Sequence, residues 1–181
     1  MSVLVIVNGI PGTGKTTISR KLAADLRLPL ISKDDIKEFL FGRLGGSGLE
    51  NSKLLGRVSV DSLYRVAAEY AQADKDVMIE NAFWHSFAHD AIARITKETS
   101  VKIIEVYCET APGIYKARIL ERQKNGERSA AHLDYPPLDS VAMQKYAPLG
   151  LGPTIEVDTT TFDDAAYDAL LAKLSNLLKP N

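Results

Sequence analysis

The chain has 181 residues, of which 45% are hydrophobic and 25% are charged, and its formal net charge is −1. This length and composition fit one globular domain over residues 1–181 better than two. With a net charge so close to zero, no global positive field attracts a long polynucleotide or an anionic membrane, although a local basic patch stays compatible with it.

Two features bear on the cellular compartment. Cys108 is the single cysteine, so no intramolecular disulfide can form, and its place at the end of an apolar run predicts a buried, inert thiol. Residues 1–7 lack the basic region and cleavage site of a signal peptide, and their apolar run is too short to span a bilayer. These features predict a cytoplasmic protein that makes no membrane contact.

Short apolar segments alternate with segments of helical periodicity along the chain. We expect strands at residues 3–7, 28–31, 77–79, 101–107 and 154–157, and helices at 15–26, 34–40, 54–73, 87–99, 112–124 and 163–178. Continuous apolar runs are typical of parallel strands buried on both faces, and the alternation indicates βαβ units. The sequence therefore predicts an α/β fold with a parallel sheet and helices on both faces.

Two segments do not fit this alternation. Residues 42–48 contain four glycines, which predicts a mobile loop. Residues 125–137 mix Gly, Ser and His with a Pro-Pro pair, and are expected to form a long loop. Such loops are often lids or binding loops, but a plain surface connection is the alternative.

The segment after the first predicted strand reads Gly-Ile-Pro-Gly-Thr-Gly-Lys-Thr and opens the first predicted helix. It satisfies the G-x-x-x-x-G-K-(S/T) pattern of a phosphate-binding loop, in the context that the pattern needs. Backbone amides would surround the β-phosphate, Lys15 would reach the β- and γ-phosphates, and Thr16 would ligate Mg²⁺. The pattern predicts ATP and Mg²⁺ as cofactors, with the nucleotide held by Gly9, Pro11, Gly12, Thr13, Gly14, Lys15, Thr16 and Thr17.

Two carboxylates follow the second predicted strand, in the run Ser-Lys-Asp-Asp from Ser32. Ligands of an open parallel sheet bind beyond the carboxyl ends of its strands, so Asp34 and Asp35 should lie near the phosphate-binding loop. Ser32 and Asp35 match a variant capping box, which leaves Asp34 to accept the proton of an acceptor hydroxyl. Lys37 would contact the transferred phosphate or an anionic acceptor, or would be a solvated helix lysine.

The same run loosely matches the guanine-recognition pattern (N/T)-K-x-D. That pattern belongs late in a GTPase chain, whereas this run follows the second strand and no better match occurs downstream. The sequence therefore favours ATP over GTP.

The spacing from the phosphate-binding loop to Ser32 resembles the small P-loop kinases grouped with polynucleotide kinases, chloramphenicol phosphotransferases and zeta toxins. More closely, it resembles the predicted bacterial kinases of the AAA-type group. The resemblance implies a nucleoside-monophosphate-kinase-like P-loop domain, with five parallel strands in the order 2-3-1-4-5 and an arginine-bearing lid at about residues 115–137. It also implies that Asp34 is the base and that a basic residue at position 37, commonly arginine, helps to bind phosphate.

The third predicted strand ends in Glu80 and Asn81, as a Walker B segment does. Glu80 would hold Mg²⁺ through water or orient the acceptor, with Asn81 beside it. Trp84 follows closely and would stack on the acceptor, while His85 could donate a hydrogen bond to it. Alternatively, these side chains pack the top of the next helix.

The predicted helix at 112–124 carries Arg118 and Arg122 four residues apart, and Arg128 follows in the expected lid. Arginines of a closing lid stabilise the charge that develops on a transferred phosphoryl group. We rank Arg122 first, Arg118 second and Arg128 third for this role, with solvated helix charges as the alternative. The run Asp-Thr-Thr from Asp158 resembles a turn that related kinases place near the adenine, and the alternative is that Asp158 caps the final helix region.

These features predict an ATP-dependent kinase that moves the γ-phosphate of ATP to a hydroxyl of a small-molecule acceptor. Candidate acceptors are an antibiotic, a sugar or sugar nucleotide, a nucleoside, and the 5′-hydroxyl of a short oligonucleotide. The alternative is an ATP-binding switch or slow ATPase that acts through a protein partner. A pocket beside Asp34 shaped for a small molecule would favour the kinase.

Overall fold

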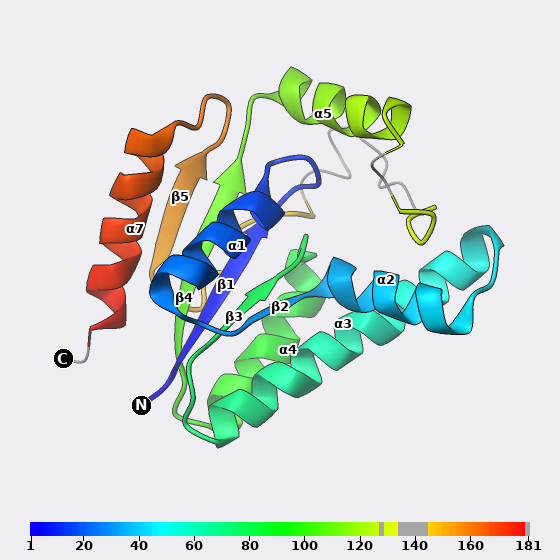
Figure 1. The fold of residues 1–181 in the computed structure, drawn as a ribbon. Helices are drawn as coiled ribbons and strands as arrows, with labels where there is room; N and C mark the ends of the chain where they lie inside the picture. The colour runs from blue at the N-terminus through cyan, green and yellow to red at the C-terminus, as the bar shows by residue number, and fades with distance from the viewer. Residues whose placement is uncertain (127–128, 134–144, 180–181) are drawn as a thin grey trace.

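The computed structural model describes residues 1–126, 129–133 and 145–179 (Figure 1). Within them, five parallel strands form one sheet in the order β2-β3-β1-β4-β5, which confirms the expected architecture. The strands are β1 Val3–Gly9, β2 Leu30–Ser32, β3 Val77–Glu80, β4 Lys102–Glu109 and β5 Thr154–Asp158.

Helices cover both faces of the sheet. α1 and α7 pack on one face, and α3 and α4 pack on the other (Figure 1). None of the helices in the described part of the chain is long and apolar enough to cross a membrane. The helices are α1 Lys15–Leu26, α2 Lys33–Leu44, α3 Gly48–Gln72, α4 His85–Glu98, α5 Pro112–Lys124 and α7 Asp164–Leu178.

The central strand β1 explains why the sheet needs helices on both faces. All seven of its residues are buried, and the side chains of residues 3–7 alternate between two apolar clusters. Val5 packs toward α1 and α7, whereas Leu4 and Ile6 pack toward α3 and α4. Each fully buried side chain of this kind stabilises the fold by about 1.5–3 kcal/mol, so β1 fixes the position of the loop that follows it.

The predicted loop over residues 42–48 is wrong at both ends. Gly42 lies within α2, Gly48 begins α3, and only residues 45–47 connect the two helices. A glycine inside a helix costs about 1 kcal/mol relative to alanine, and packing between α2 and α3 offsets such a cost. Gly45 and Gly46 have φ values of 65° and 102°, so the glycines in the short connection serve a tight turn.

The predicted capping box at the start of α2 is also wrong. Ser32 occupies the N-cap position, but its side chain makes no capping hydrogen bond. Its hydroxyl instead donates to the Glu80 carboxylate at 2.8 Å. Asp35 forms an ion pair of 2.8 Å with Arg20 of α1, so its structural role is to link two helices.

Candidate active site

The phosphate-binding loop joins β1 to α1 through three glycines with positive φ. Gly9, Gly12 and Gly14 have φ values of 137°, 88° and 76°, which other residues rarely adopt. A Cβ on Gly12 would lie 2.8 Å from the carbonyl oxygen of Tyr115 in α5. The glycines therefore serve both the turn itself and the close approach of α5 to the loop.

The positive N-terminal end of α1 and the Lys15 ammonium both lie at the phosphate-binding loop. Gly14 is the N-cap of α1, with no capping side chain and no acidic residue in the first turn, so the positive end of the helix is not neutralised. The buried Lys15 ammonium donates a hydrogen bond of 2.8 Å to the carbonyl of Ile10. The Thr13 hydroxyl donates to the same carbonyl at 2.8 Å. Lys15 thus folds back over the loop.

Lys15, Asp34 and Glu80 come from three different elements and interact through their charges. Burial lowers the pKa of Lys15, while the negative charges of Glu80 and Asp34 oppose this shift. Burial likewise raises the pKa of Glu80, and the Lys15 charge opposes that shift. The structure therefore brings together the predicted phosphate-binding lysine, the predicted base and the predicted Mg²⁺ carboxylate.

Asp34 lies at the start of α2 and faces positive groups. Its Oδ1 atom is 3.0 Å from Lys33 Nζ and 3.9 Å from His132 Nδ1. Burial alone would raise the pKa of Asp34, but the charges of Lys33, His132 and Lys15 outweigh it and leave the pKa lowered. This environment favours the carboxylate, which is the form that a general base needs.

Thr16 and Glu80 fit the oxygen chemistry of Mg²⁺. Glu80 is 4% exposed, and one of its oxygens accepts the hydrogen bond from Ser32. Mg²⁺ usually keeps several waters and binds one or two protein oxygens together with substrate phosphates. The described residues contain no group of three or more His, Cys, Asp or Glu side chains that could hold a metal by themselves. The Mg²⁺ site predicted at Thr16 and Glu80 stays a prediction.

Lys37 is fully buried, so the prediction of a solvated helix lysine is wrong. Its ammonium donates a hydrogen bond of 3.0 Å to the Ser52 hydroxyl of α3. The same hydroxyl donates to the Ala131 carbonyl at 2.7 Å and accepts the Leu133 amide at 3.2 Å. The predicted contact of Lys37 with phosphate stays a prediction.

Trp84 is 44% exposed and belongs to an aromatic group beside the loop. Its ring packs edge-to-face on Tyr146 at 6.5 Å, and the Lys145 ammonium lies 5.1 Å from its ring centroid. Tyr146 packs in a cluster with Ile10 of the phosphate-binding loop. Asn81 continues β3, and its main-chain amide donates to the Val7 carbonyl at 3.3 Å. The stacking of Trp84 on an acceptor stays a prediction.

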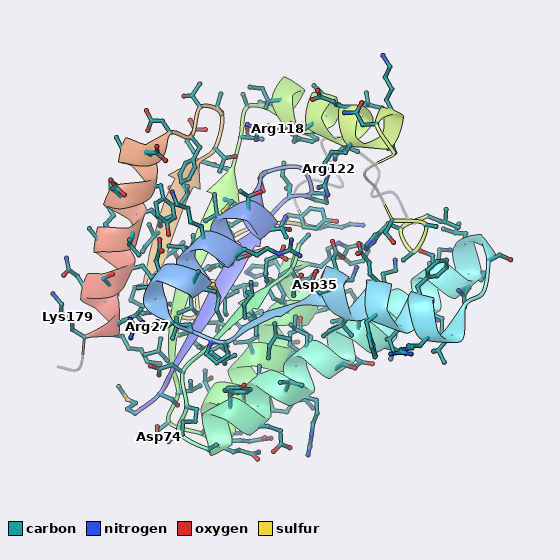
Figure 2. The ribbon with its side chains drawn as sticks, viewed as in Figure 1. Arg27, Asp35, Asp74, Arg118, Arg122 and Lys179 are labelled. Carbon is teal, nitrogen blue, oxygen red and sulfur yellow. The ribbon has the colours of Figure 1, made fainter. Side chains whose placement is uncertain are left out.

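The two arginines of α5 have different surroundings. Arg118 donates to the Thr159 carbonyl at 2.8 Å, so its guanidinium is engaged by the turn after β5. Arg122 is exposed and pairs with no other described residue. Figure 2 shows both side chains on α5, which overhangs the loop between β1 and α1. Arg128 and residues 134–137 of the predicted lid lie outside the described residues.

His132 was missed by the sequence analysis. Its Nε2 atom is 3.0 Å from the Glu38 carboxylate, and its side chain is 10% exposed. Burial lowers the pKa of His132, while the neighbouring Asp34 and Glu38 carboxylates oppose this shift. No sequence signal could have identified it, because its partners lie 94 or more positions earlier in the chain.

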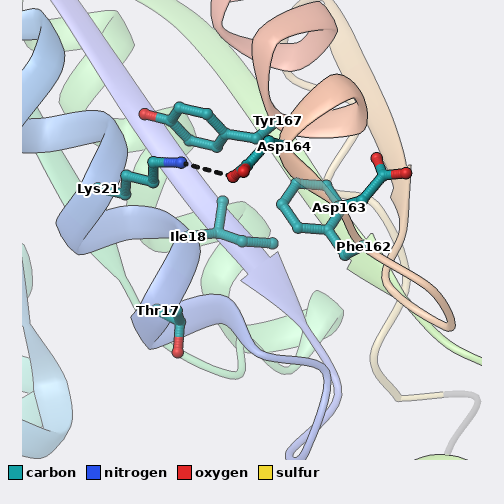
Figure 3. A pocket seen from close by; sticks show the side chains of 7 residues that line it. All are labelled: Thr17, Ile18, Lys21, Phe162, Asp163, Asp164 and Tyr167. Carbon is teal, nitrogen blue, oxygen red and sulfur yellow. Dashed lines mark ion pairs between the residues drawn. The ribbon is translucent and has the colours of Figure 1, made fainter.

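A cavity of about 350 Å³ lies between the start of α1 and the start of α7 (Figure 3). It begins directly after the phosphate-binding loop, at Thr17. Lys21 crosses it, with its ammonium 3.5 Å from Asp164 and 3.7 Å from the centroid of the Tyr167 ring. The lining residues are Thr17, Ile18, Lys21, Phe162, Asp163, Asp164 and Tyr167.

The chain is similar to several known proteins. A family model described as "AAA domain" matches residues 4–135. A crystal structure from Chloroflexus aurantiacus, described as a "putative kinase", has a TM-score of 0.89 and 32% identity and covers 98% of this chain and 99% of that one. The APS kinase of Mycobacterium tuberculosis, in complex with AMPPNP and APS, has a TM-score of 0.63 at 16% identity over 99% of this chain and 98% of its own. The latter likeness shows the fold alone.

Curated relatives are longer than this chain. Uncharacterized proteins of Mycobacterium tuberculosis and Mycobacterium bovis are 26% identical to it over 137 residues. The match covers 72% of this chain, which spans about 28% of the length of these relatives.

Proposed function

The chain is a P-loop kinase of the AAA domain family, and we propose that it moves the γ-phosphate of ATP to a hydroxyl of a small-molecule acceptor. The observation that carries this proposal is the placement of Lys15, Asp34 and Glu80 at the carboxyl-terminal edge of the neighbouring strands β1, β2 and β3, where their charges also shift pKa values within the group. It combines a phosphate-binding cation, a carboxylate base and a metal-binding carboxylate, which is the set that phosphoryl transfer to an alcohol requires.

The phosphates of ATP bind in the loop from Gly9 to Thr16, at the uncapped N-terminus of α1. Lys15 exchanges the Ile10 carbonyl for phosphate oxygens, since a charge-assisted bond to phosphate is stronger than a bond to a neutral carbonyl. Thr16 and Glu80 would hold Mg²⁺, which would supply positive charge to the phosphates. Exposed Arg122 on α5 approaches the γ-phosphate from the other side.

The nucleoside end of ATP occupies the 350 Å³ cavity between α1 and α7. This cavity follows the loop directly at Thr17, and Phe162 and Tyr167 provide apolar surface for a base. Arg118, held by Thr159, borders this side of the site rather than the acceptor side. It therefore supports nucleotide binding and does not stabilise the transferred phosphoryl group.

Asp34 accepts the proton of the acceptor hydroxyl as the new O–P bond forms and ADP leaves. Its Oδ1 atom faces Lys33 and His132, and its Oδ2 atom has no partner among the described residues. Oδ2 is thus the oxygen that receives the acceptor. The near-neutral charge of the chain disfavours a long polynucleotide and leaves small molecules and short oligonucleotides as acceptors.

Acceptor-stimulated ATP consumption tests this proposal. Turnover would be measured with a panel of antibiotics, sugars, nucleosides and short oligonucleotides, for the wild type, Asp34→Asn and Asp35→Asn. We expect at least one acceptor to stimulate the wild type and Asp35→Asn, whose position pairs with Arg20, but not Asp34→Asn, which still binds ATP. If a protein partner stimulates turnover and no acceptor does, the switch alternative replaces the kinase.

A further inference from the structure

Residues 129–133 form a turn that is fixed to α3 on both sides of one histidine. The His132 amide donates to the Ser129 carbonyl at 3.0 Å within the turn. The residues before and after it, Ala131 and Leu133, both bond to the Ser52 hydroxyl, at 2.7 Å and 3.2 Å. The backbone at His132 is therefore held in one place by a hydroxyl that the buried Lys37 also contacts.

The His132 ring reaches two carboxylates that lie one helical turn apart on α2. Its Nε2 atom is 3.0 Å from Glu38 Oε1, and its Nδ1 atom is 3.9 Å from Asp34 Oδ1. Residues four apart on a helix share a face, so one planar ring can meet both side chains. Because the ring is 10% exposed, its contacts are screened by solvent less than those of a surface histidine.

The contact engages only one oxygen of Asp34. Oδ1 lies 3.0 Å from Nζ of the neighbouring Lys33 and 3.9 Å from Nδ1 of His132, which belongs to a distant segment of the chain. An imidazolium charge, or the N–H dipole of a neutral ring, favours the carboxylate over the protonated acid. Lys33 donates a hydrogen bond to Oδ1 and the His132 ring lies near the same oxygen, whereas Oδ2 accepts no hydrogen bond from the described residues.

We propose that His132 is a positioning residue for phosphoryl transfer, which holds Asp34 as an oriented carboxylate with Oδ2 directed at the acceptor hydroxyl. The catalytic meaning of this contact rests on the proposed function. The contact itself can be tested without any acceptor, because it acts on the ionisation of Asp34 in the free protein.

The ionisation of Asp34 and of His132 depends on the charged groups around both side chains. Asp34 faces Lys33, His132 and Lys15, which favour its ionised form, and the Glu80 carboxylate, whose like charge disfavours it. His132 faces Asp34 and Glu38, which favour its protonated form, and Lys33 and Lys37, which disfavour it. Removal of the ring takes one stabilising neighbour from the Asp34 carboxylate, so Asp34 should take up its proton at a higher pH.

The test compares His132→Gln with His89→Gln, a histidine substitution on the exposed part of α4 that contacts Asp90 instead of Asp34. The titration of Asp34 would be followed by the carboxyl ¹³C resonance, assigned with Asp34→Asn. We expect the midpoint to move to higher pH in His132→Gln and to stay unchanged in His89→Gln. A midpoint that does not move in His132→Gln overturns the proposal. His132→Asn, a smaller neutral substitution, provides a second measurement with the same expected direction.

Two further readouts separate this role from a merely structural one. Affinity for a fluorescent ATP analogue should be unchanged in His132→Gln, because the ring contacts α2 and not the phosphate-binding loop. With an acceptor that the wild type phosphorylates, kcat should fall about tenfold while the KM for ATP stays constant, as expected for a misdirected base. A parallel loss of ATP affinity would instead indicate damage to the fold and would contradict the proposal.

Failure of this inference and failure of the proposed function give different results. A wild type that phosphorylates an acceptor, together with an unshifted Asp34 midpoint in His132→Gln, overturns the inference alone. A shifted midpoint in a protein that transfers no phosphate to any acceptor overturns the proposed function and leaves only the contact between His132 and Asp34.

Discussion

The hydroxyl of Ser32 donates a hydrogen bond of 2.8 Å to the carboxylate of Glu80, across the neighbouring ends of β2 and β3. Glu80 is buried, and a buried carboxylate oxygen without a hydrogen-bond partner costs stability; the Ser32 hydroxyl provides that partner for one oxygen. Since Ser32 directly precedes α2, the bond also connects the proposed Mg²⁺ carboxylate to the helix that carries Asp34.

Ser32→Ala should make nucleotide binding more sensitive to acid. Burial raises the pKa of Glu80, and the Ser32 hydrogen bond acts against that rise, so its loss raises the pKa further. Glu80 is then protonated at a higher pH, and the Mg²⁺ that needs its carboxylate binds more weakly as the pH falls. Calorimetric titration with a non-hydrolysable MgATP analogue at pH 6 and pH 8 would show a larger difference for Ser32→Ala than for the wild type.

The control for this prediction is Ser62→Ala, at a partly buried serine of α3 whose hydroxyl donates to the Val58 carbonyl of the same helix. Equal pH sensitivity of the wild type and Ser32→Ala would show that the Ser32 bond does not support the metal-binding form of Glu80.

Lys15→Met should abolish most phosphoryl transfer. The loss of a preorganised cation at the transferred phosphate typically costs about 10²–10³-fold in kcat. Lys173→Met removes an exposed lysine of α7 and serves as the matched control. The measurement is the initial rate of ADP formation by the wild type, Lys15→Met and Lys173→Met. A rate for Lys15→Met within threefold of the rate for Lys173→Met would rule out Lys15 as the phosphate-binding group.

Gly12→Ala should destabilise the fold as well as the loop. The new methyl group would lie 2.8 Å from the Tyr115 carbonyl, and φ at this position is 88°. We expect a loss of about 1–3 kcal/mol in the free energy of unfolding by urea. Gly113→Ala, in α5 with no atom within 4 Å of the new methyl, should leave that free energy unchanged or slightly increased. Equal effects of the two substitutions would contradict a close approach of α5 to the loop.

Cys108 should resist alkylation in the folded protein. Burial raises the pKa of its thiol to about 12, although the Lys15 charge opposes this, so almost no thiolate forms at pH 8. Iodoacetamide followed by mass spectrometry should leave the native chain unmodified and label it fully in denaturant. Rapid labelling of the native chain would show that β4 opens near the phosphate-binding loop.

The periodicity of the sequence predicted the elements with the strongest local signals. The structure bears out the predicted bounds of α1 and α5, because the first follows a glycine loop at Lys15 and the second starts at Pro112. The strand order is confirmed, but it was implied by the family resemblance, since periodicity does not determine which strands are neighbours.

The errors arose where distant segments decide the outcome. Ser32 looked like a helix cap, but Glu80 competes for its hydroxyl from the adjacent strand. For Lys37 the sequence left a phosphate contact and a solvated helix lysine open, and the second is wrong because the side chain is buried and its ammonium donates to Ser52 of α3. His132 showed no local pattern, because its partners on α2 come from much earlier in the chain.

The measurement that tests the account most directly is the transfer of an isotopically labelled γ-phosphate from ATP into a metabolite extract, followed by mass spectrometry. The wild type and Asp35→Asn should produce the same labelled phosphorylated metabolite, and Asp34→Asn should produce none while it still binds ATP. Release of the label only as free phosphate by the wild type, or equal product from Asp34→Asn, would contradict an alcohol kinase with Asp34 as its base.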